Sequence, residues 1–165
     1  MTTANIHSQK ILILDFGSQY TQLIARRVRE LGVYCEIWDY AVDEQLFREF
    51  DPQGVIFSGS PESANHDDSP RPPEFIYDAG KPILGICYGM QTMAEHFSGK
   101  VEASSKSEFG FAQVDVIAPN KLFDGIEDRI NEKAAPQLDV WMSHGDKVTE
   151  VPPGFSLIAE TQSAP

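Results

Sequence analysis

The sequence is poor in cysteine and has no cluster of histidines. Its two cysteines, Cys35 and Cys87, are too few for a disulfide framework, and no partner stands at metal-ligand spacing from either of them. The four histidines are scattered along the chain, whereas a zinc site needs them clustered. We therefore expect a protein without a disulfide framework and without a metal site.

Long apolar runs and an excess of positive charge are also missing. No apolar run approaches the ~20 residues that span a bilayer, and the N-terminal residues lack the basic region and apolar core of a signal peptide. The formal net charge of -12 argues against a nucleic-acid surface. We expect a cytoplasmic protein whose partners include neither a membrane nor a nucleic acid.

What the sequence does contain is typical of a globular domain. Of its 165 residues, 41% are hydrophobic and 23% are charged, which suits one domain with a substantial core. The expected strands are 10–16, 33–39, 54–57 and 82–86, and the expected helices are 19–31, 43–50, 74–79 and 88–97. This alternation predicts the α/β class, with a doubly wound, mostly parallel open sheet flanked by helices.

The pattern changes after Gly99. Short β-like stretches at 101–103, 109–117, 139–142 and 155–159 are separated by loops. The small residues of segment 142–146 predict one of these loops, at the end of a strand. The C-terminal half is therefore expected to form a smaller antiparallel β extension.

Cys87 stands where a short strand gives way to a helix, and Gly85 and Gly89 flank it. This Gly-x-Cys-x-Gly pattern is the thiol counterpart of the nucleophile elbow, a sharp turn in which side chains at the glycine positions would collide with neighbouring backbone. Such a turn lifts the sulfur above the carboxyl edge of the sheet, where open α/β folds bind ligands. The helix N-terminus favours thiolate over thiol, and the N–H of Tyr88 could face an oxyanion.

A lone cysteine in an apolar run is more often a small buried hydrophobe than a nucleophile. The paired glycines argue against that alternative for Cys87. So does a second glycine-bearing loop, Ser58–Ser63, which follows the third expected strand at the same edge of the sheet. We therefore favour a nucleophile at this position.

Six segments carry a family resemblance: Ile11–Glu36, Ser69–Arg71, Gly85–Ala94, Val101–Ser104, Glu108–Val114 and Asp139–Val148. Together they span essentially the whole chain, and they resemble the N-terminal glutaminase domain of class I, triad-type glutamine amidotransferases that carry an ATP-pyrophosphatase domain. The resemblance implies that Cys87 attacks the side-chain amide of L-glutamine, releases ammonia and leaves a γ-glutamyl thioester that water hydrolyses.

The resemblance also implies roles for further groups. Backbone N–H groups of Tyr88 and of the Gly59-Ser60 pair would form the oxyanion hole. The glutamine pocket would be made by Gln91, Ser143, His144, Gly145 and Asp146. No cofactor is implied for this domain, whereas ATP and Mg²⁺ are implied for the ATP-pyrophosphatase domain, which would use the ammonia to aminate xanthosine monophosphate. The complete enzyme is expected to be a homo-oligomer.

The sequence departs from the family pattern in two places. The family usually has Gly-Gly-Pro where this chain has Gly59-Ser60-Pro61, and serine resists backbone geometries that glycine permits. Either the Ser60 N–H points inward with ordinary dihedral angles, or the oxyanion hole is imperfect. The family's Gly-x-Gln-Phe-His-Pro-Glu segment, with its base and orienting acid, does not occur before Pro165. We expect residues 1–165 to be a glutaminase domain that is incomplete at its C-terminus and poor in turnover.

Two alternative functions stay open. The chain could be a regulatory module that binds glutamine without chemistry, or an unrelated cysteine hydrolase that uses the same elbow. His144 is not expected to replace the missing base, because a base must reach the thiol within hydrogen-bond distance and a loop histidine is more often a structural or binding group.

Overall fold

The computed structural model describes residues 9–66, 68–132 and 134–161. The chain divides into two compact units, Met1–Met93 and Ala94–Pro165, and a single domain over residues 1–165 stays a prediction. Among the helices in the described ranges, none has both the length and the apolar character that a membrane crossing requires.

The first unit is built on a parallel sheet of four strands. Its strands are β1 (Lys10–Asp15), β2 (Tyr34–Asp39), β3 (Gly54–Phe57) and β4 (Ile83–Gly85). The helices that follow them are α1 (Thr21–Glu30), α2 (Glu44–Phe50), α3 (Phe75–Asp78) and α4 (Tyr88–His96), the last of which ends in the second unit. The spatial order of the strands is β2-β1-β3-β4.

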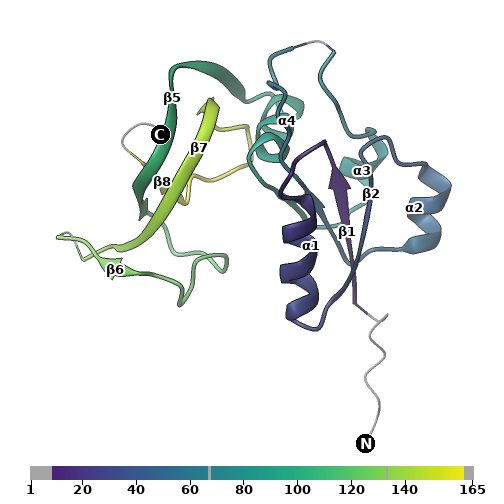
Figure 1. Ribbon diagram of the computed structural model, residues 1–165, viewed down its shortest axis with the longest axis horizontal. Coiled ribbons are helices and arrows are strands. Elements are labelled where there is room, and N and C mark those ends of the chain that lie inside the picture. Colours follow the sequence, from purple (N-terminus) through teal and green to yellow (C-terminus); the bar gives the residue numbers. More distant parts are fainter. Residues whose placement is uncertain (1–8, 67, 133, 162–165) are drawn as a thin grey trace, which may run out of the picture. The chain divides into compact units, whose positions relative to one another are not determined.

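Helices cover both faces of this sheet. Strand β2 lies on one side of β1, and β3 lies on the other side. The connections from β1 to β2 and from β2 to β3 therefore cross the sheet in opposite directions. Because such crossovers are right-handed, α1 and α2 lie on opposite faces, as Figure 1 shows. The prediction of a doubly wound, mostly parallel sheet in this part of the chain is confirmed.

The apolar run of β1 forms the centre of the core. Leu12, Ile13 and Leu14 are all 0% exposed, because β1 has a strand on each side and helices over both faces. The strand register aligns Ile13 with Ile37 of β2 and with Ile56 of β3. A buried central strand of the sheet therefore carries the loop that begins at Phe16.

Helix ends follow the local chemistry of the sequence. Asp43 caps α2, with its carboxylate accepting a hydrogen bond of 3.0 Å from the Leu46 N–H. Gly32, with a φ of +74°, follows the end of α1 in the left-handed conformation that glycine adopts easily. Both helices therefore begin and end within two residues of their predicted limits.

The winding direction reverses at β1, so the carboxyl ends of β1 and β3 lie at a topological switch point. Ligand sites in open parallel sheets form there, because the two connections leave in opposite directions and open a crevice between them. The loops after β1, β3 and β4 begin at Phe16, Ser58 and Ile86. These three loops mark the edge at which a site is expected.

The second unit is antiparallel. Its strands are β5 (Lys100–Val116), β6 (Arg129–Ile130), β7 (Pro136–Glu150) and β8 (Ala159–Glu160), in the order β6-β7-β5-β8. Long strands β5 and β7 form most of it, and β6 and β8 add short pairings at either edge. The predicted antiparallel extension is confirmed, although its strand limits differ from those expected.

Two local predictions for this unit were wrong. Segment 142–146 is not a loop but part of β7, since Ser143 pairs with Phe109 and Asp146 pairs with Ala103. Cross-strand pairing overrides the weak strand preference of these small residues, and a register shift between Ala103 and Glu108 absorbs the irregularity. The strand expected at 155–159 is reduced to the two residues of β8.

An aromatic cluster lies beneath the loops at the carboxyl edge of the first unit. The ring of Phe16, only 3% exposed, has its centroid 5.7 Å from that of Tyr40, 5.7 Å from that of Phe57 and 5.6 Å from that of Tyr88. Phe16 follows β1, Tyr40 follows β2, Phe57 ends β3 and Tyr88 begins α4. Phe16 therefore joins the ends of four elements through ring contacts.

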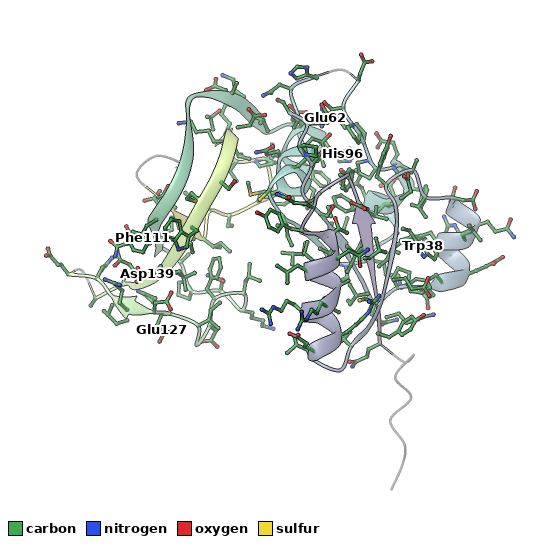
Figure 2. The ribbon with its side chains drawn as sticks, in the orientation of Figure 1. Trp38, Glu62, His96, Phe111, Glu127 and Asp139 are labelled. Carbon is green, nitrogen blue, oxygen red and sulfur yellow. The ribbon has the colours of Figure 1, made fainter. Side chains whose placement is uncertain are left out.

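Replacing Phe16 should destabilise the first unit strongly. We expect Phe16→Ala to lower the free energy of unfolding by about 3–5 kcal/mol, because it leaves a cavity where four elements meet. Urea denaturation followed by circular dichroism measures the loss. Phe111→Ala is the matched control, because Phe111 of β5 is 58% exposed (Figure 2) and should change stability by less than about 0.5 kcal/mol. Equal effects of the two variants would contradict the central role of Phe16.

Candidate functional site

Cys87 occupies the predicted turn between β4 and α4. Its φ is +51°, a left-handed conformation that costs a residue with a Cβ about 1–2 kcal/mol. The carbonyl of Cys87 accepts a hydrogen bond of 3.1 Å from the Gln91 N–H, which makes Cys87 the residue that caps α4. The strand, the strained turn and the helix are the arrangement of a nucleophile elbow.

Both flanking glycines are required by close backbone packing, as predicted. A Cβ added to Gly85 would lie 2.6 Å from the N and 2.7 Å from the Cα of Met90. A Cβ added to Gly89 would lie 2.6 Å from the Cβ of Phe57. Real side chains do not approach so closely, so any other residue at either position would push α4 away from the sheet.

Hydrogen bonds join the elbow to the end of β3. The N–H of Ile86 donates to the Phe57 carbonyl at 3.0 Å, and the N–H of Gly89 donates to the Ser58 carbonyl at 3.1 Å. The residues on either side of Cys87 are therefore fixed to the neighbouring strand and to the loop that follows it. This pairing places the thiol beside the Ser58–Ser63 loop.

Gly59 in that loop lies directly against Cys87. A Cβ added to Gly59 would lie 3.7 Å from the Cβ of Cys87 and 3.4 Å from the Oγ of Ser18. The loops after β1, β3 and β4 thus converge on one point. Sequence reasoning did not identify Ser18, and its only signal was a small polar residue after a glycine at the carboxyl end of β1.

Ser60 adopts an ordinary backbone conformation. The non-glycine residues of the described ranges with positive φ are Asp51, Cys87, Ser98 and Ala134, and Ser60 is not among them. Its Oγ accepts a hydrogen bond of 3.1 Å from the Glu62 N–H, and Figure 2 labels Glu62 in this exposed loop. Its own N–H has no acceptor within the described part of the chain. Serine is therefore accommodated here without left-handed strain.

The side chain of Tyr88 fixes the first residue of α4. Its ring is 2% exposed, and its hydroxyl donates a hydrogen bond of 2.5 Å to the Pro70 carbonyl. The neighbouring Arg71 donates from Nη1 to the Thr92 Oγ1 at 2.9 Å. The loop before α3 is thus attached to the same helix, and the Tyr88 N–H belongs to the first turn of that helix.

The predicted glutamine-binding residues fall in both units. Gln91 is buried in α4, one turn after Cys87, with 6% of its surface exposed. Four others, Ser143, His144, Gly145 and Asp146, lie consecutively on β7. Tyr88 follows Cys87 directly, Gln91 lies one helical turn after it, and Gly59, which precedes Ser60, lies against it. A pocket shared with the β7 residues stays a prediction.

The two cysteines differ in environment. Cys35 is buried in the core, and its thiol donates to the Ala25 carbonyl at 3.5 Å. The Cys87 side chain reaches solvent, yet the groups packed around it withhold enough water to raise the pKa of its thiol above the ordinary value. Desolvation therefore opposes the stabilisation of the thiolate that is expected from the helix N-terminus.

Metal ligands are not assembled in the described ranges: no group of three or more His, Cys, Asp or Glu residues there could hold an ion. The converging loops bring together one thiol, the Ser18 hydroxyl and backbone N–H groups. That combination is suited to acyl transfer, in which a sulfur forms a bond to a carbonyl carbon and N–H groups receive the charge on oxygen.

Curated relatives match nearly the full sequence. The chain is 62% identical over 163 residues to the glutamine-hydrolyzing GMP synthase of Alteromonas mediterranea, and the alignment covers 99% of this chain and 31% of that protein. It is 60% identical over 163 residues to the same enzyme of Photorhabdus laumondii, with the same coverage. The chain thus spans about a third of the length of these relatives.

Solved structures and a family model agree on the class. A Thermoplasma acidophilum protein, described as one of the subunits of a GMP synthase, superposes with a TM-score of 0.75 at 28% identity, over 94% of this chain and 74% of that chain. A glutamine amidotransferase from Thermotoga maritima shows the same fold, with a TM-score of 0.71 at 19% identity over 94% of this chain and 68% of that chain. The family model described as glutamine amidotransferase class-I matches residues 12–164. The chain therefore belongs to the class I glutamine amidotransferases.

Proposed function

We propose that this chain is the glutaminase part of a glutamine-hydrolysing GMP synthase and that Cys87 is its nucleophile. The observation that carries the proposal is the position of Cys87 in a strained turn between β4 and α4, against Gly59 of the loop after β3. Identity of about 60% to GMP synthases supports the choice among family members. Because the chain spans 31% of those relatives, the activity of the whole enzyme is part of the proposal.

The proposed reaction begins with the Cys87 thiolate. Its sulfur forms a bond to the carbonyl carbon of the glutamine side-chain amide, and the C=O electron pair moves onto oxygen. The N–H groups of Ser60 and Tyr88 stabilise the resulting oxyanion, and losing one such donor typically costs about 3–4 kcal/mol of barrier. When the carbonyl re-forms, the C–N bond breaks and the nitrogen takes up a proton and leaves as ammonia.

The second half of the proposed reaction regenerates the thiol. Water attacks the γ-glutamyl thioester, a second oxyanion forms at the same site, and the C–S bond breaks to release glutamate. Gln91, which is buried one turn after Cys87, is the residue of α4 that is proposed to line the glutamine pocket. Ser143, His144, Gly145 and Asp146 are proposed to hold the amino acid end of the substrate.

The reaction also needs a base, because the pKa of the Cys87 thiol is raised by desolvation. The family resemblance places this base in a His-Pro-Glu segment, which the present sequence does not contain. We therefore expect slow turnover from these residues alone. In this proposal the residues of the chain position the carbonyl group, and the proton is removed by a histidine supplied elsewhere in the enzyme.

The ammonia is proposed to reach an ATP-pyrophosphatase domain of the same enzyme, which converts xanthosine monophosphate to GMP. ATP and Mg²⁺ belong to that step, and the described residues of this chain form no cluster of three or more His, Cys, Asp or Glu that could hold the metal ion. No step in this chain is therefore assigned to either. A homo-oligomeric state and a cytoplasmic location stay predictions.

A diazo-ketone analogue of glutamine should label Cys87 and not Cys35. The analogue resembles the substrate and carries an electrophile where the amide carbonyl stands, while the Cys35 thiol is buried in the core. Peptide mass spectrometry of the labelled chain identifies the site. Cys35→Ala should retain the label, and Cys87→Ala should lose it. A label on Cys35 with Cys87 unmodified would refute the assignment.

The reactivity of Cys87 should depend on pH with a raised pKa. Desolvation disfavours the charged thiolate, so the thiolate fraction at neutral pH is small and rises through a pKa above the ordinary cysteine value. The rate of Cys87 alkylation by iodoacetamide should therefore keep increasing at alkaline pH where the urea-denatured chain has reached its plateau. A plateau already at neutral pH would contradict the raised pKa.

In the complete enzyme, Cys87→Ala should separate two activities. Glutamine-dependent GMP formation should fall by more than about 1,000-fold, since the nucleophile is lost, while GMP formation from added ammonium should remain. Cys35→Ala is the matched control and should retain both activities. Glutamine hydrolysis that survives Cys87→Ala would reject Cys87 as nucleophile, and binding of glutamine without ammonia release by the parent enzyme would favour a regulatory module.

A further inference from the structure

We infer that Arg71 is a positioning residue for substrate binding, because its guanidinium and the Tyr88 hydroxyl together hold α4 in the orientation that places Gln91 in the glutamine pocket. The inference rests on the proposed function, since Gln91 is a pocket residue only in that function. Arg71 belongs to the segment Ser69–Arg71, which has no role in the proposed reaction itself.

Arg71 connects a loop to a helix through two hydrogen bonds from one side chain. Its Nη1 donates to the Thr92 Oγ1 at 2.9 Å, and its Nη2 donates to the Ala64 carbonyl. Thr92 is 1% exposed and Ala64 is 0% exposed. Hydrogen bonds from a charged donor are stronger than those between neutral groups, and the planar guanidinium keeps its two acceptors at a fixed separation.

The segment that carries Arg71 is itself held in place. Ser69 is 7% exposed, its hydroxyl donates to the Ser63 carbonyl, and its backbone N–H donates to the His66 carbonyl at 3.1 Å. The Pro70 carbonyl accepts the hydrogen bond from the Tyr88 hydroxyl. The loop therefore offers α4 a fixed attachment at two neighbouring residues.

The two attachments on α4 are one helical turn apart. Tyr88 and Thr92 are separated by four positions and so lie on the same face of the helix. One attachment would let a helix turn about its axis, whereas two attachments a turn apart oppose both rotation and sliding. Cys87 and Gln91 are also four positions apart, on a face roughly 100° away. Holding the first face therefore also sets the direction of the second.

The start of α4 has further anchors that do not involve Arg71. The N–H groups of Ile86 and Gly89 donate to carbonyls at the end of β3, and these bonds hold Cys87 from both sides. Gln91 lies beyond them along the helix, next to the residue that Arg71 bonds. Loss of the Arg71 side chain should therefore disturb substrate binding more than it disturbs the thiol.

The test compares Arg71→Ala and Thr92→Val with the parent in the complete enzyme. Each is measured for kcat and KM with glutamine, for inhibition by glutamate, and for the rates at which Cys87 reacts with iodoacetamide and with the diazo-ketone analogue of glutamine. Iodoacetamide reports on the thiol alone, whereas glutamate and the analogue need the pocket. We expect KM and the inhibition constant of glutamate to rise about tenfold and labelling by the analogue to slow by a similar factor, with kcat and the iodoacetamide rate within about threefold of the parent.

Three controls sharpen the comparison. Because Arg71 is exposed, R71A removes no core side chain, and added guanidinium ion at millimolar concentration should lower its KM toward the parent value without affecting that of T92V. The double variant should be no worse than R71A, since both changes remove the same bond. Arg48→Ala removes an exposed arginine that pairs with Glu44 on α2, and it should leave every parameter at the parent value.

The outcomes distinguish this inference from the proposed function. If the parent neither hydrolyses glutamine nor reacts at Cys87, the proposed function fails. If the parent is active and R71A keeps KM and glutamate inhibition within threefold of it, only the inference about Arg71 is overturned. An effect of R71A without one of T92V would also overturn it, since α4 would then not be the route. So would an equal loss of iodoacetamide reactivity, which indicates a general loss of structure.

Discussion

The contact between the start of α4 and the end of β3 is the constraint on which the rest of the site depends. Gly89 packs so closely on Phe57 that an added Cβ would lie 2.6 Å from the Phe57 Cβ, and the N–H groups of Ile86 and Gly89 both donate to carbonyls at the end of β3. Cys87 lies between these two anchors, so it keeps its φ of +51°. The strained turn is thus held by packing on the neighbouring strand.

Backbone N–H and C=O groups at the sheet edge find their hydrogen-bond partners around the same contact. Where parallel strands end, their last N–H and C=O groups lose their strand partners and must find others. The Ser58 hydroxyl accepts a hydrogen bond from the Phe16 N–H and donates one to the Gly59 carbonyl. The N–H groups of Ile86 and Gly89, in the turn around Cys87, bond the carbonyls of Phe57 and Ser58. The Ser60 N–H stays without an acceptor in the described ranges. A donor without a protein acceptor at such an edge can bind water or a ligand, which agrees with the proposed oxyanion site.

Sequence reasoning succeeded where the signal is local. Hydrophobic periodicity, the Asp43 cap and the glycines around Cys87 depend on residues a few positions apart, and they placed the elements of the first unit to within about two residues. Sequence reasoning failed where contacts between segments far apart in the sequence determine the structure. The strand through residues 142–146 exists because β5 pairs with it, and the roles of Ser18 and Ser58 depend on residues about 40 positions away. No local pattern encodes such contacts.

Positioning and activation of the proposed nucleophile are separable in this fold. The turn at Cys87 and the loop proposed to supply an oxyanion donor are held by one parallel sheet and its loops, all within the first unit. The raised pKa of the thiol works against activation, because each unit of increase lowers the thiolate fraction at neutral pH about tenfold. N–H donors act on the oxyanion only once the bond to carbon is forming, so they cannot compensate for a missing thiolate. In the proposed reaction, proton removal is therefore assigned to a group supplied elsewhere in the enzyme, and the geometry of the elbow is useful only when that group is in place.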